Sequence, residues 1–268
     1  MDLGLKGRLA LVTGSTRGLG KAIAEALAME KADIIINGRN RETLNKTALE
    51  IGLKSNTDIY NCCIDTTKPE EIRNFFKESF WLKKIDVLVN NVGNIETFGK
   101  FEDLTEEDWQ KSFDLTFMSA VRFIKASLPY LKKSDQARII NISSLSAHQP
   151  SFTGLNPHYG MAKAGMVNLT KNLAADFGRY GILVNTICPS TLAGGGWGQN
   201  IKDRAKRERI TDEQAEELMR KEENRKSPLS KIGELKDVAD LVVFLASANA
   251  KFLTGHCYNV DGGITRSV

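Results

Sequence analysis

The residues of this chain best suited to proton transfer are a tyrosine and a lysine four positions apart, Tyr159 and Lys163. On a helix, this spacing places both side chains on the same face, one turn apart. A phenol with a pKa of about 10 needs a shift of roughly three units, or about 4 kcal/mol, to exchange protons near neutrality. One ammonium group at about 4 Å supplies that much in a partly closed site. The pair therefore predicts acid–base chemistry, although an ordinary surface helix with an extended lysine has the same spacing.

The composition is typical of a soluble globular protein. The 268 residues are 41% hydrophobic and 26% charged, with a net charge of +4 and a pI near 8.8. Acidic and basic residues are interspersed, so neither a nucleic-acid partner nor a membrane partner is expected. The first residues lack the profile of a signal peptide, and no apolar run is long enough to span a bilayer.

The cysteines indicate a reducing compartment. Four occur, at Cys62, Cys63, Cys188 and Cys257, and three of them lie inside apolar, strand-like runs. Their spacing matches no metal-binding pattern, so no metal site is predicted and buried free thiols are the favoured interpretation. A cytoplasmic location is therefore expected.

Apolar runs of the β type alternate with helical patterns along the whole chain. Strands are expected at 8–12, 33–37, 59–64, 86–90, 138–142, 183–187 and 257–260, and helices at 18–29, 41–53, 69–82, 106–132, 158–179 and 236–247. Several of the strands are continuously apolar, which is typical of a parallel sheet covered on both faces. We therefore expect an α/β fold of Rossmann type, with a doubly wound parallel sheet and a single domain over 1–268.

The segment 190–232 is long for a connection between a strand and a helix, so we expect it to carry function. It opens with the flexible run Gly194–Gly198 and then becomes densely charged. Thr211 and Gln214 form a capping box that predicts a helix over 212–224. The nearly cancelling charges favour a solvated helix with ion pairs over an anion-binding patch. The functional hypothesis is a lid that closes over substrate.

A glycine-rich loop follows the first expected strand and opens the next helix. Its residues are Thr13, Gly14, Ser15, Thr16, Arg17, Gly18, Leu19 and Gly20. Glycines at such a turn let the backbone approach a pyrophosphate, which the helix N-terminus and its dipole stabilise. The spacing G-x-x-x-G-x-G differs from the common G-x-G-x-x-G, and a glycine loop alone also forms ordinary turns. Its place at the start of a β-α-β unit favours a dinucleotide site.

The end of the second expected strand indicates which dinucleotide is bound. Folds that select NAD place an Asp or Glu here, which accepts a hydrogen bond from the ribose 2′-hydroxyl. This chain has Gly38 and Arg39 instead. Each arginine alone also fits a solvated loop charge, but Arg39 and Arg17 together can bracket a 2′-phosphate through charge-assisted hydrogen bonds. NADP(H) is therefore favoured over NAD(H).

Together, these motifs resemble those of the short-chain dehydrogenase/reductase family, in its single-domain branch. The resemblance covers nearly the whole chain, and the motifs come in order. They are the glycine loop, Asp65 after the third strand, Asn90-Asn91-Val92-Gly93, the Tyr159/Lys163 pair, Leu253-Thr254-Gly255 and Val260-Asp261-Gly262-Gly263. The resemblance implies seven parallel strands in the order 3-2-1-4-5-6-7, with the site at their carboxyl ends.

The resemblance also assigns roles. Tyr159 would be the general acid/base, and Lys163 would lower its pKa and bind the nicotinamide ribose. Ser144 would orient the substrate oxygen and steady developing negative charge, with Ser143 as a packing neighbour. Hydride would pass between nicotinamide C4 and the substrate carbon. The cofactor contacts implied are the glycine loop from Gly14 to Gly20, Arg39, Asp65, Asn91, Gly93, Tyr159, Lys163, Ile187 and Pro189.

The chain departs from the family pattern at the proton relay. The family's catalytic Asn on the fourth helix falls on Thr116. In the family, that Asn helps to hold a water linked to the Lys, partly through a local helix distortion and a backbone carbonyl. Thr keeps the carbonyl, and its hydroxyl can bond back to the preceding turn and bend a helix. We therefore expect an altered but working relay; the alternative is a protein that does not need fast turnover.

The chain also differs from the family pattern in the segments expected to form the substrate pocket. Pro189-Ser190 stands where the family usually has Pro-Gly, and the Thr that normally lies near the carboxamide aligns with Gly194, with Thr191 as its candidate replacement. The loop between Ser144 and Tyr159 is slightly longer than is common. His148 and His158 are interpreted as loop or pocket-wall residues, not as ligands or bases. The residues expected to shape the substrate pocket are Asn94, His148, Phe152 and Trp197.

Two hypotheses of different classes follow. The first is an NADP(H)-dependent carbonyl reductase or alcohol dehydrogenase similar to 3-oxoacyl-(acyl-carrier-protein) reductases, acting on a small-molecule or acyl-thioester substrate. A polyol, sugar or cyclic-alcohol dehydrogenase is the alternative within that class. The second is a cofactor-binding sensor or scaffold, which Thr116 supports and the intact Ser144, Tyr159 and Lys163 set opposes. The resemblance also implies a homotetramer or homodimer.

Overall fold

A seven-stranded parallel sheet forms the centre of the computed structural model, which describes residues 2–151 and 153–266. Its strands are β1 (Leu9–Val12), β2 (Asp33–Gly38), β3 (Ile59–Cys63), β4 (Val87–Asn90), β5 (Arg138–Ile142), β6 (Leu183–Pro189) and β9 (Cys257–Val260). They are ordered β3-β2-β1-β4-β5-β6-β9, and every neighbouring pair is parallel. The predicted α/β Rossmann-type fold and strand order are confirmed, with β9 as the seventh strand.

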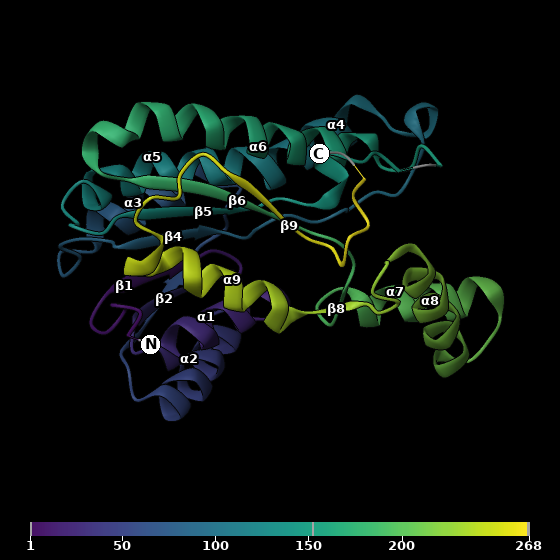
Figure 1. Ribbon diagram of the computed structural model, residues 1–268, viewed down its shortest axis with the longest axis horizontal. Helices are drawn as coiled ribbons and strands as arrows, with labels where there is room; N and C mark the ends of the chain where they lie inside the picture. The colour runs from purple at the N-terminus through teal and green to yellow at the C-terminus, as the bar shows by residue number, and fades with distance from the viewer. Residues whose placement is uncertain (1, 152, 267–268) are drawn as a thin grey trace.

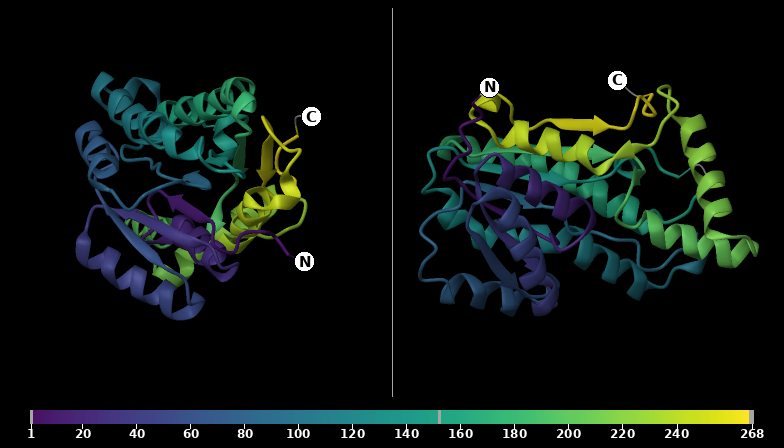
Figure 2. Two further views of the ribbon diagram at one scale, coloured as in Figure 1. Left: turned by 90° about the vertical axis from the view of Figure 1, so that its left-hand side faces the viewer. Right: turned by 90° about the horizontal axis from the view of Figure 1, so that it is seen from below.

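Helices cover both faces of the sheet (Figures 1 and 2). One layer holds α1 (Gly18–Met29), α2 (Arg41–Ser55) and α9 (Leu235–Ala246). The other holds α3 (Pro69–Glu78), α4 (Glu106–Phe113), α5 (Ser119–Leu131) and α6 (Pro157–Phe177). In the described part of the chain, no helix is both long and apolar enough to cross a membrane.

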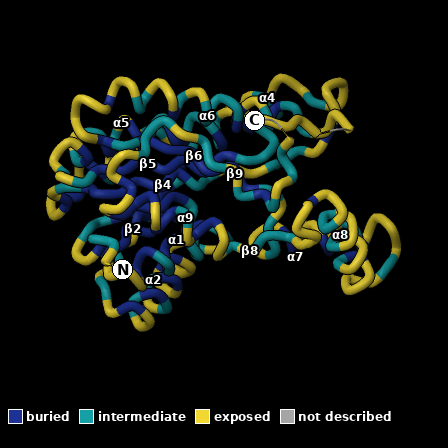
Figure 3. Tube along the Cα trace, in the orientation of Figure 1, coloured by how far each residue is buried: buried dark blue, intermediate teal, exposed yellow. Residues whose placement is uncertain are grey.

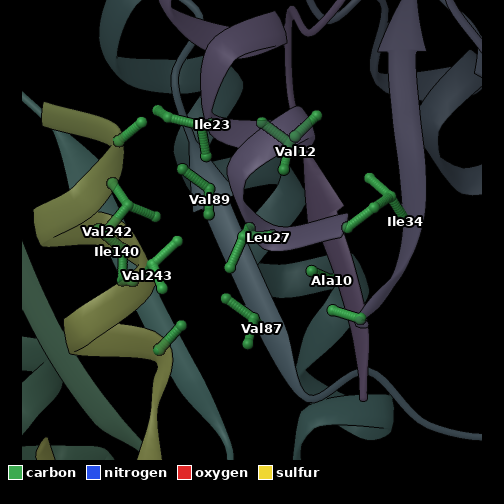
Figure 4. Packing of buried hydrophobic residues seen from close by; sticks show 14 of the residues in the cluster. Ala10, Val12, Ile23, Leu27, Ile34, Val87, Val89, Ile140, Val242 and Val243 are labelled. Atoms are coloured by element: carbon green, nitrogen blue, oxygen red, sulfur yellow. The ribbon is translucent and has the colours of Figure 1, made fainter. Parts of the chain in front are cut away.

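Each strand divides its apolar side chains between the two layers. In β1, Ala10 and Val12 pack with α1 and α9, whereas Leu11 packs with the opposite layer, because successive side chains of a strand point to opposite faces. Figure 4 shows Leu27 of α1 between Ala10 and Val12 of this strand on one side and Val242 and Val243 of α9 on the other. The central strands are the most deeply buried part of the trace (Figure 3). This packing fixes the start of α1, which carries the glycine loop, against the sheet.

The helix predicted over 106–132 is interrupted. The structure has α4, then a π-helical turn over Asp114–Met118, then α5. Thr105 caps α4 by accepting a hydrogen bond from the Asp108 backbone N–H. A π turn holds one more residue than an α turn without changing the apolar periodicity enough to be seen in sequence. The prediction of one continuous helix is therefore wrong at this turn.

The segment between β6 and α9 forms a helical pair that we call the lid, residues 190–232. It contains β7 (Leu192–Ala193), α7 (Trp197–Glu208) and α8 (Asp212–Lys226), and β7 pairs with β8 (Gly233–Glu234). The capping box at Thr211 and Gln214 is confirmed, but α7 was not predicted. The lid has a small apolar core of its own and stands away from the sheet, largely exposed (Figures 1 and 3).

Candidate active site

The carboxyl ends of the central strands bring the predicted catalytic residues together. Ser144 follows β5, Gly93 follows β4, and Tyr159 and Lys163 lie one turn apart on α6. The Ser144 hydroxyl acts on the Tyr159 phenol in the direction that lowers its pKa. Lys163 Nζ lies 5.7 Å from the centroid of the Tyr159 ring. Three side chains able to give, orient or stabilise a proton thus share one edge of the sheet.

Lys163 is held rigidly at this edge. Its side chain is buried, and its Nζ donates a 2.7 Å hydrogen bond to the Ile142 carbonyl at the end of β5. Its own carbonyl accepts a 2.8 Å bond from the hydroxyl of buried Ser143, which is the packing role expected for that serine. A Cβ atom at Gly93 would lie 2.8 Å from Nζ, so only glycine leaves room for the ammonium here. The position of the lysine therefore depends on both β4 and β5.

Burial controls the protonation of the pair. Desolvation raises the pKa of Tyr159 to about 12, against the opposing hydrogen bond from Ser144. Desolvation also lowers the pKa of Lys163 to about 8. The lowering of the tyrosine pKa by Lys163 stays a prediction, since Nζ is here directed to the Ile142 carbonyl and a buried ammonium is itself disfavoured. Charge or hydrogen bonds from a bound ligand must therefore help to stabilise a phenolate.

Thr116 lies at the centre of the π-helical turn. It is fully buried, and its Oγ1 has no hydrogen-bond partner among the described residues. A Cβ at Gly93 would be 3.3 Å from its Cγ2, which places it beside the strand end that contacts Lys163. The helix distortion associated with the family's Asn is present, as the π turn. The bond expected from the Thr116 hydroxyl to the preceding turn is not formed.

The glycine loop leaves its backbone open for close approach. Gly14 and Gly18 adopt positive φ values of +62° and +55°, which glycine accepts without strain. A Cβ at Gly20 would lie 2.3 Å from the Gly14 carbonyl oxygen and 2.5 Å from Asn91 Nδ2, so no larger residue fits. Gly18 also faces Gly195 of the lid, where a Cβ would meet the Gly195 Cα at 2.9 Å. The loop and the lid are therefore neighbours.

Two asparagines hold the loop in shape. Asn37, buried at the end of β2, accepts a 3.0 Å hydrogen bond from the Gly14 N–H through its side chain. Asn91 donates from Nδ2 to the carbonyls of Thr13 and Gly14 at 3.0 and 3.3 Å. Asn91 was expected only as a cofactor contact, so its role in holding the loop was missed, as was that of Asn37. A polar residue at the end of an otherwise apolar strand was the available signal.

The remaining loop residues divide between structure and surface. Ser15 is fully buried, and its hydroxyl donates to the Val12 carbonyl at 2.7 Å, so it is a structural residue of the loop. Thr16 packs against Gly38, where a Cβ would lie 2.7 Å from its methyl carbon. Leu19 packs at the margin of the core. Arg17 is the N-cap of α1 and is exposed.

At the adenosine end, Arg39 lies just beyond β2 with 77% of its side chain exposed, and its Nη1 is 4.0 Å from Asp65 Oδ2. Burial raises the pKa of the Asp65 carboxyl, but hydrogen bonds from the N–H and hydroxyl of Thr67 outweigh it, so the net pKa is lowered. Asp65 is therefore an anion with free acceptor capacity. Arg39 and Arg17 are both exposed charges at the mouth of the glycine loop.

Ile187 and Pro189, expected on the nicotinamide side, are buried at the end of β6. Ser190 leaves the strand by donating its N–H to the Val260 carbonyl at 3.1 Å. Gly194 has a φ of +110°, and a Cβ there would lie 2.9 Å from Leu235 Cδ1, so this position cannot carry the family's Thr. Thr191 is exposed at the start of the lid.

The four residues expected to shape the substrate pocket do not share one place. Asn94 is exposed after β4. Trp197 is only 6% exposed because it packs in the core of the lid, not over Tyr159. His148 is directed to Cys257, with Nε2 3.1 Å from Sγ. Phe152 lies outside the described residues. His158 is buried against Trp109.

These residues fit a nicotinamide dinucleotide. Glycines whose Cβ would collide line the loop at the start of α1, and Thr116, beside Gly93, has a buried hydroxyl without a partner among the described residues. Backbone N–H groups at the start of a helix are the ordinary binding site for a pyrophosphate. The chain thus offers phosphate donors at one end and an acid–base set at the other.

Comparison with known proteins shows relatives over the whole chain. Residues 14–265 match the family model of enoyl-(acyl carrier protein) reductase. The chain is 34% identical over 262 residues to D-beta-hydroxybutyrate dehydrogenase of Rhizobium meliloti, covering 96% of this chain and 98% of that protein. It is 31% identical over 265 residues to 3-oxoacyl-(acyl-carrier-protein) reductase FabG of Aquifex aeolicus, covering 98% and 100%. The chain belongs to the short-chain dehydrogenase/reductase family.

A solved structure supports the same assignment. L-sorbose reductase from Gluconobacter frateurii, in complex with NADPH and L-sorbose, is similar over 100% of both chains, with a TM-score of 0.92 and 28% sequence identity. As a short-chain dehydrogenase/reductase, the protein is an oxidoreductase that acts on CH–OH groups with a nicotinamide cofactor. The identification from sequence motifs is thereby confirmed at the level of family, fold and reaction class.

Proposed function

We propose that this protein is an NADP(H)-dependent oxidoreductase that interconverts a carbonyl and a secondary alcohol, with Tyr159 as acid/base. The observation that carries the proposal is the grouping of Ser144, Tyr159 and buried Lys163 at the strand ends beside the glycine loop. When bound, the nicotinamide ring supplies or accepts the hydride.

The residues of this chain handle the proton. In the direction of reduction, Tyr159 donates its phenolic proton to the carbonyl oxygen as hydride reaches the carbonyl carbon. The Ser144 hydroxyl donates a hydrogen bond to the same oxygen and stabilises its developing charge. Lys163, held by the Ile142 carbonyl, places positive charge behind the phenol when it is protonated. The π turn at Thr116 is the helix distortion from which a backbone carbonyl would serve the proton relay.

The charges at the end of β2 support a preference for NADP(H). The strand ends in Asn37-Gly38-Arg39, with no carboxylate to accept from a 2′-hydroxyl. The contact between Arg39 and Asp65 is long and exposed, so exchanging it for a 2′-phosphate costs little. Arg17, which is also exposed beside the glycine loop, supplies a second positive charge.

Binding of NADPH and NADH to purified protein, followed by thermal shift, tests this preference. We expect Arg39→Ala to weaken NADPH binding by about 10–100-fold, because charge-assisted hydrogen bonds are lost, and to leave NADH binding nearly unchanged. Arg73→Ala on the exposed face of α3 is the matched control. Equal losses for both cofactors would contradict the role of Arg39.

For the substrate we propose a 3-oxoacyl thioester, with a sugar or polyol as the second candidate. The relative FabG supports the first, and the similarity to L-sorbose reductase supports the second. The test is oxidation of NADPH by a panel of β-ketoacyl thioesters, ketoses and cyclic ketones. Turnover with none of them would contradict the proposed reaction.

A non-catalytic sensor or scaffold is the hypothesis from another class, and Thr116 is the residue that tests it. Because Thr116 is fully buried against Gly93, the longer side chain of Asn has little room, and we expect Thr116→Asn to leave the rate unchanged or lower it. A large gain in rate would instead mark a decayed site. Steady-state kcat with the best substrate of the panel measures the difference.

We also propose a homodimer or homotetramer, built on the outer faces of α4 and α6. Phe113 is 38% exposed and Met161 is 60% exposed on these helices, which is apolar surface that a second copy would cover. Size-exclusion chromatography with light scattering tests this. A monomer at micromolar concentration would contradict it.

A further inference from the structure

Three potential metal ligands meet beside the active site although they are far apart in the sequence. His148 ends the short 3-10 helix after Ser144, Cys188 lies near the end of β6, and Cys257 begins β9. The Cys188 and Cys257 sulfurs are 3.2 Å apart, and His148 Nε2 is 3.1 Å from the Cys257 sulfur. One ligand atom from each residue lies within 4.8 Å of the other two. No part of the proposed hydride transfer uses this group.

The distances suit a tetrahedral ion after a small expansion. Zinc with Zn–S bonds of about 2.3 Å and Zn–N bonds of about 2.0–2.1 Å holds two sulfurs about 3.8 Å apart, and sulfur and nitrogen about 3.5 Å apart. The observed separations of 3.2 and 3.1 Å are each shorter by about half an ångström. Side-chain rotations alone can open the cluster by that amount, because His148 is on an exposed loop and Cys257 is half-exposed.

A disulfide between the two cysteines fits less well. Disulfide sulfurs are about 2.05 Å apart, so this pair would have to approach by more than about 1 Å. The two cysteines are offset across the sheet, since Cys188 is paired with Asn259 and Cys257 with Thr186. A disulfide also leaves no part for His148, whose Nε2 is directed at the sulfur.

The ligand set is that of a borderline-soft cation with an exchangeable position. Two thiolates and one imidazole are favoured by zinc, whereas magnesium and calcium require oxygen ligands. Three protein ligands leave a fourth position for water or another small ligand. The rigid part of the site comes from adjacent strands β6 and β9, and the movable part from the loop with His148.

We propose that His148 Nε2, Cys188 Sγ and Cys257 Sγ form a binding site for a single zinc-type divalent cation. The ion would join the segment after Ser144 to the last two strands of the sheet, at the wall of the active site. Binding displaces the thiol protons, which are released to solvent, and involves no change of oxidation state.

Cobalt substitution tests the site directly, without substrate or cofactor. The full-length protein is reduced, stripped with a chelator and titrated anaerobically with Co²⁺. We expect thiolate-to-cobalt charge-transfer absorption and tetrahedral d–d bands that saturate at one equivalent per chain and vanish when Zn²⁺ is added. Zn²⁺ should also raise the melting temperature, because it binds only the folded state, and a chelator should reverse the gain.

Variants assign the ligands. We expect Cys188→Ser and Cys257→Ser each to lose more than about 100-fold in metal affinity, and His148→Gln to lose at least about 10-fold, since even outer-shell changes cost 10–100-fold. Cys63→Ser, on the distant strand β3, is the matched control and should bind as the wild type does.

Several outcomes would overturn the proposal. The first is the absence of thiolate charge transfer in folded wild-type protein at millimolar cobalt. The second is unchanged cobalt absorption in both folded serine variants at positions 188 and 257. The third is a Cys188–Cys257 peptide pair, two hydrogens lighter, recovered from protein prepared under reducing conditions. Since no turnover is measured, failure here leaves the oxidoreductase proposal intact, and failure of that proposal leaves the metal site intact.

Discussion

At the scale of single residues, burial favours the neutral forms of Tyr159 and Lys163. It raises the pKa of the phenol to about 12 and lowers the pKa of the amine to about 8. Near neutral pH the phenol is therefore neutral while the Lys163 amine still holds its proton, and a phenolate forms only where the site supplies compensating charge or hydrogen bonds. Ser144 supplies one such bond. The spacing of the pair could be found in the sequence, but the sign of the tyrosine shift could not, because desolvation depends on the packing of β4, β5 and α6.

The loss of the phenol tests its role. We expect Tyr159→Phe to lower kcat by about 10²–10⁴-fold, because the proton donor is removed while the ring remains. NADPH affinity, measured by thermal shift, should change little. Tyr180→Phe, at an exposed position after α6, is the matched control. Turnover retained within a few-fold of wild type would exclude Tyr159 as the acid.

Lys163 makes stability depend on pH. Its pKa is about 8 in the folded protein against an ordinary 10.5, so the unfolded chain binds more protons between these values. The free energy of unfolding of wild type should therefore rise relative to Lys163→Met, by roughly 3 kcal/mol in total, as pH increases from about 8 to about 10.5. Below pH 8 the difference between the two proteins should be constant. Urea denaturation across this range measures it, and a difference that stays flat throughout would contradict the buried ammonium.

At the scale of elements, the glycine loop was predicted well because it obeys local rules. The positive φ of Gly14 and Gly18 and the crowding at Gly20 are needs that only glycine meets, and they leave a pattern in sequence. The π turn and α7 left no such pattern. One additional residue inside a helix hardly disturbs apolar periodicity, and α7 begins in a glycine run that ordinarily signals a loop.

Two glycines allow a matched test of the loop. Gly20→Ala puts a methyl group 2.3 Å from the Gly14 carbonyl oxygen, so we expect a loss of roughly 1–3 kcal/mol in stability and weaker NADPH binding. Gly198→Ala, in α7 with no heavy atom within 4 Å of the new methyl, should match wild type or gain up to about 1 kcal/mol. Thermal melts with and without NADPH measure both, and equal behaviour of the variants would contradict the crowding.

At the scale of the whole molecule, the strand order followed from alternation of strands and helices and from the family resemblance. The contacts between distant segments did not. His148, Cys188 and Cys257 meet because β9 returns beside β6, and Trp197 turns away from the site because α7 packs on α8. Contacts of this kind depend on how whole helices and strands pack against one another. The spacing of residues within a single helix or strand does not predict these contacts.

The core between α1 and α9 should carry much of the stability. We expect Leu27→Ala to cost about 2–5 kcal/mol, because Leu27 is fully buried between the sheet and α9 and its loss leaves a cavity. Leu53→Ala on α2, where 78% of the side chain is exposed, should cost far less. Urea denaturation compares the two, and equal costs would contradict this account of the core.

The same packing has a consequence for synthesis on the ribosome. Leu27 leaves the ribosome more than 200 residues before Val238 of α9, its eventual cover. At about 5–20 residues per second, the apolar face of α1 waits roughly 10–40 s for α9. The apolar face of α1 therefore lacks its α9 cover for most of the translation. We expect a cell making this protein to depend on factors that shelter nascent chains, and a ribosome stalled before α9 to hold a chain that proteases cut readily.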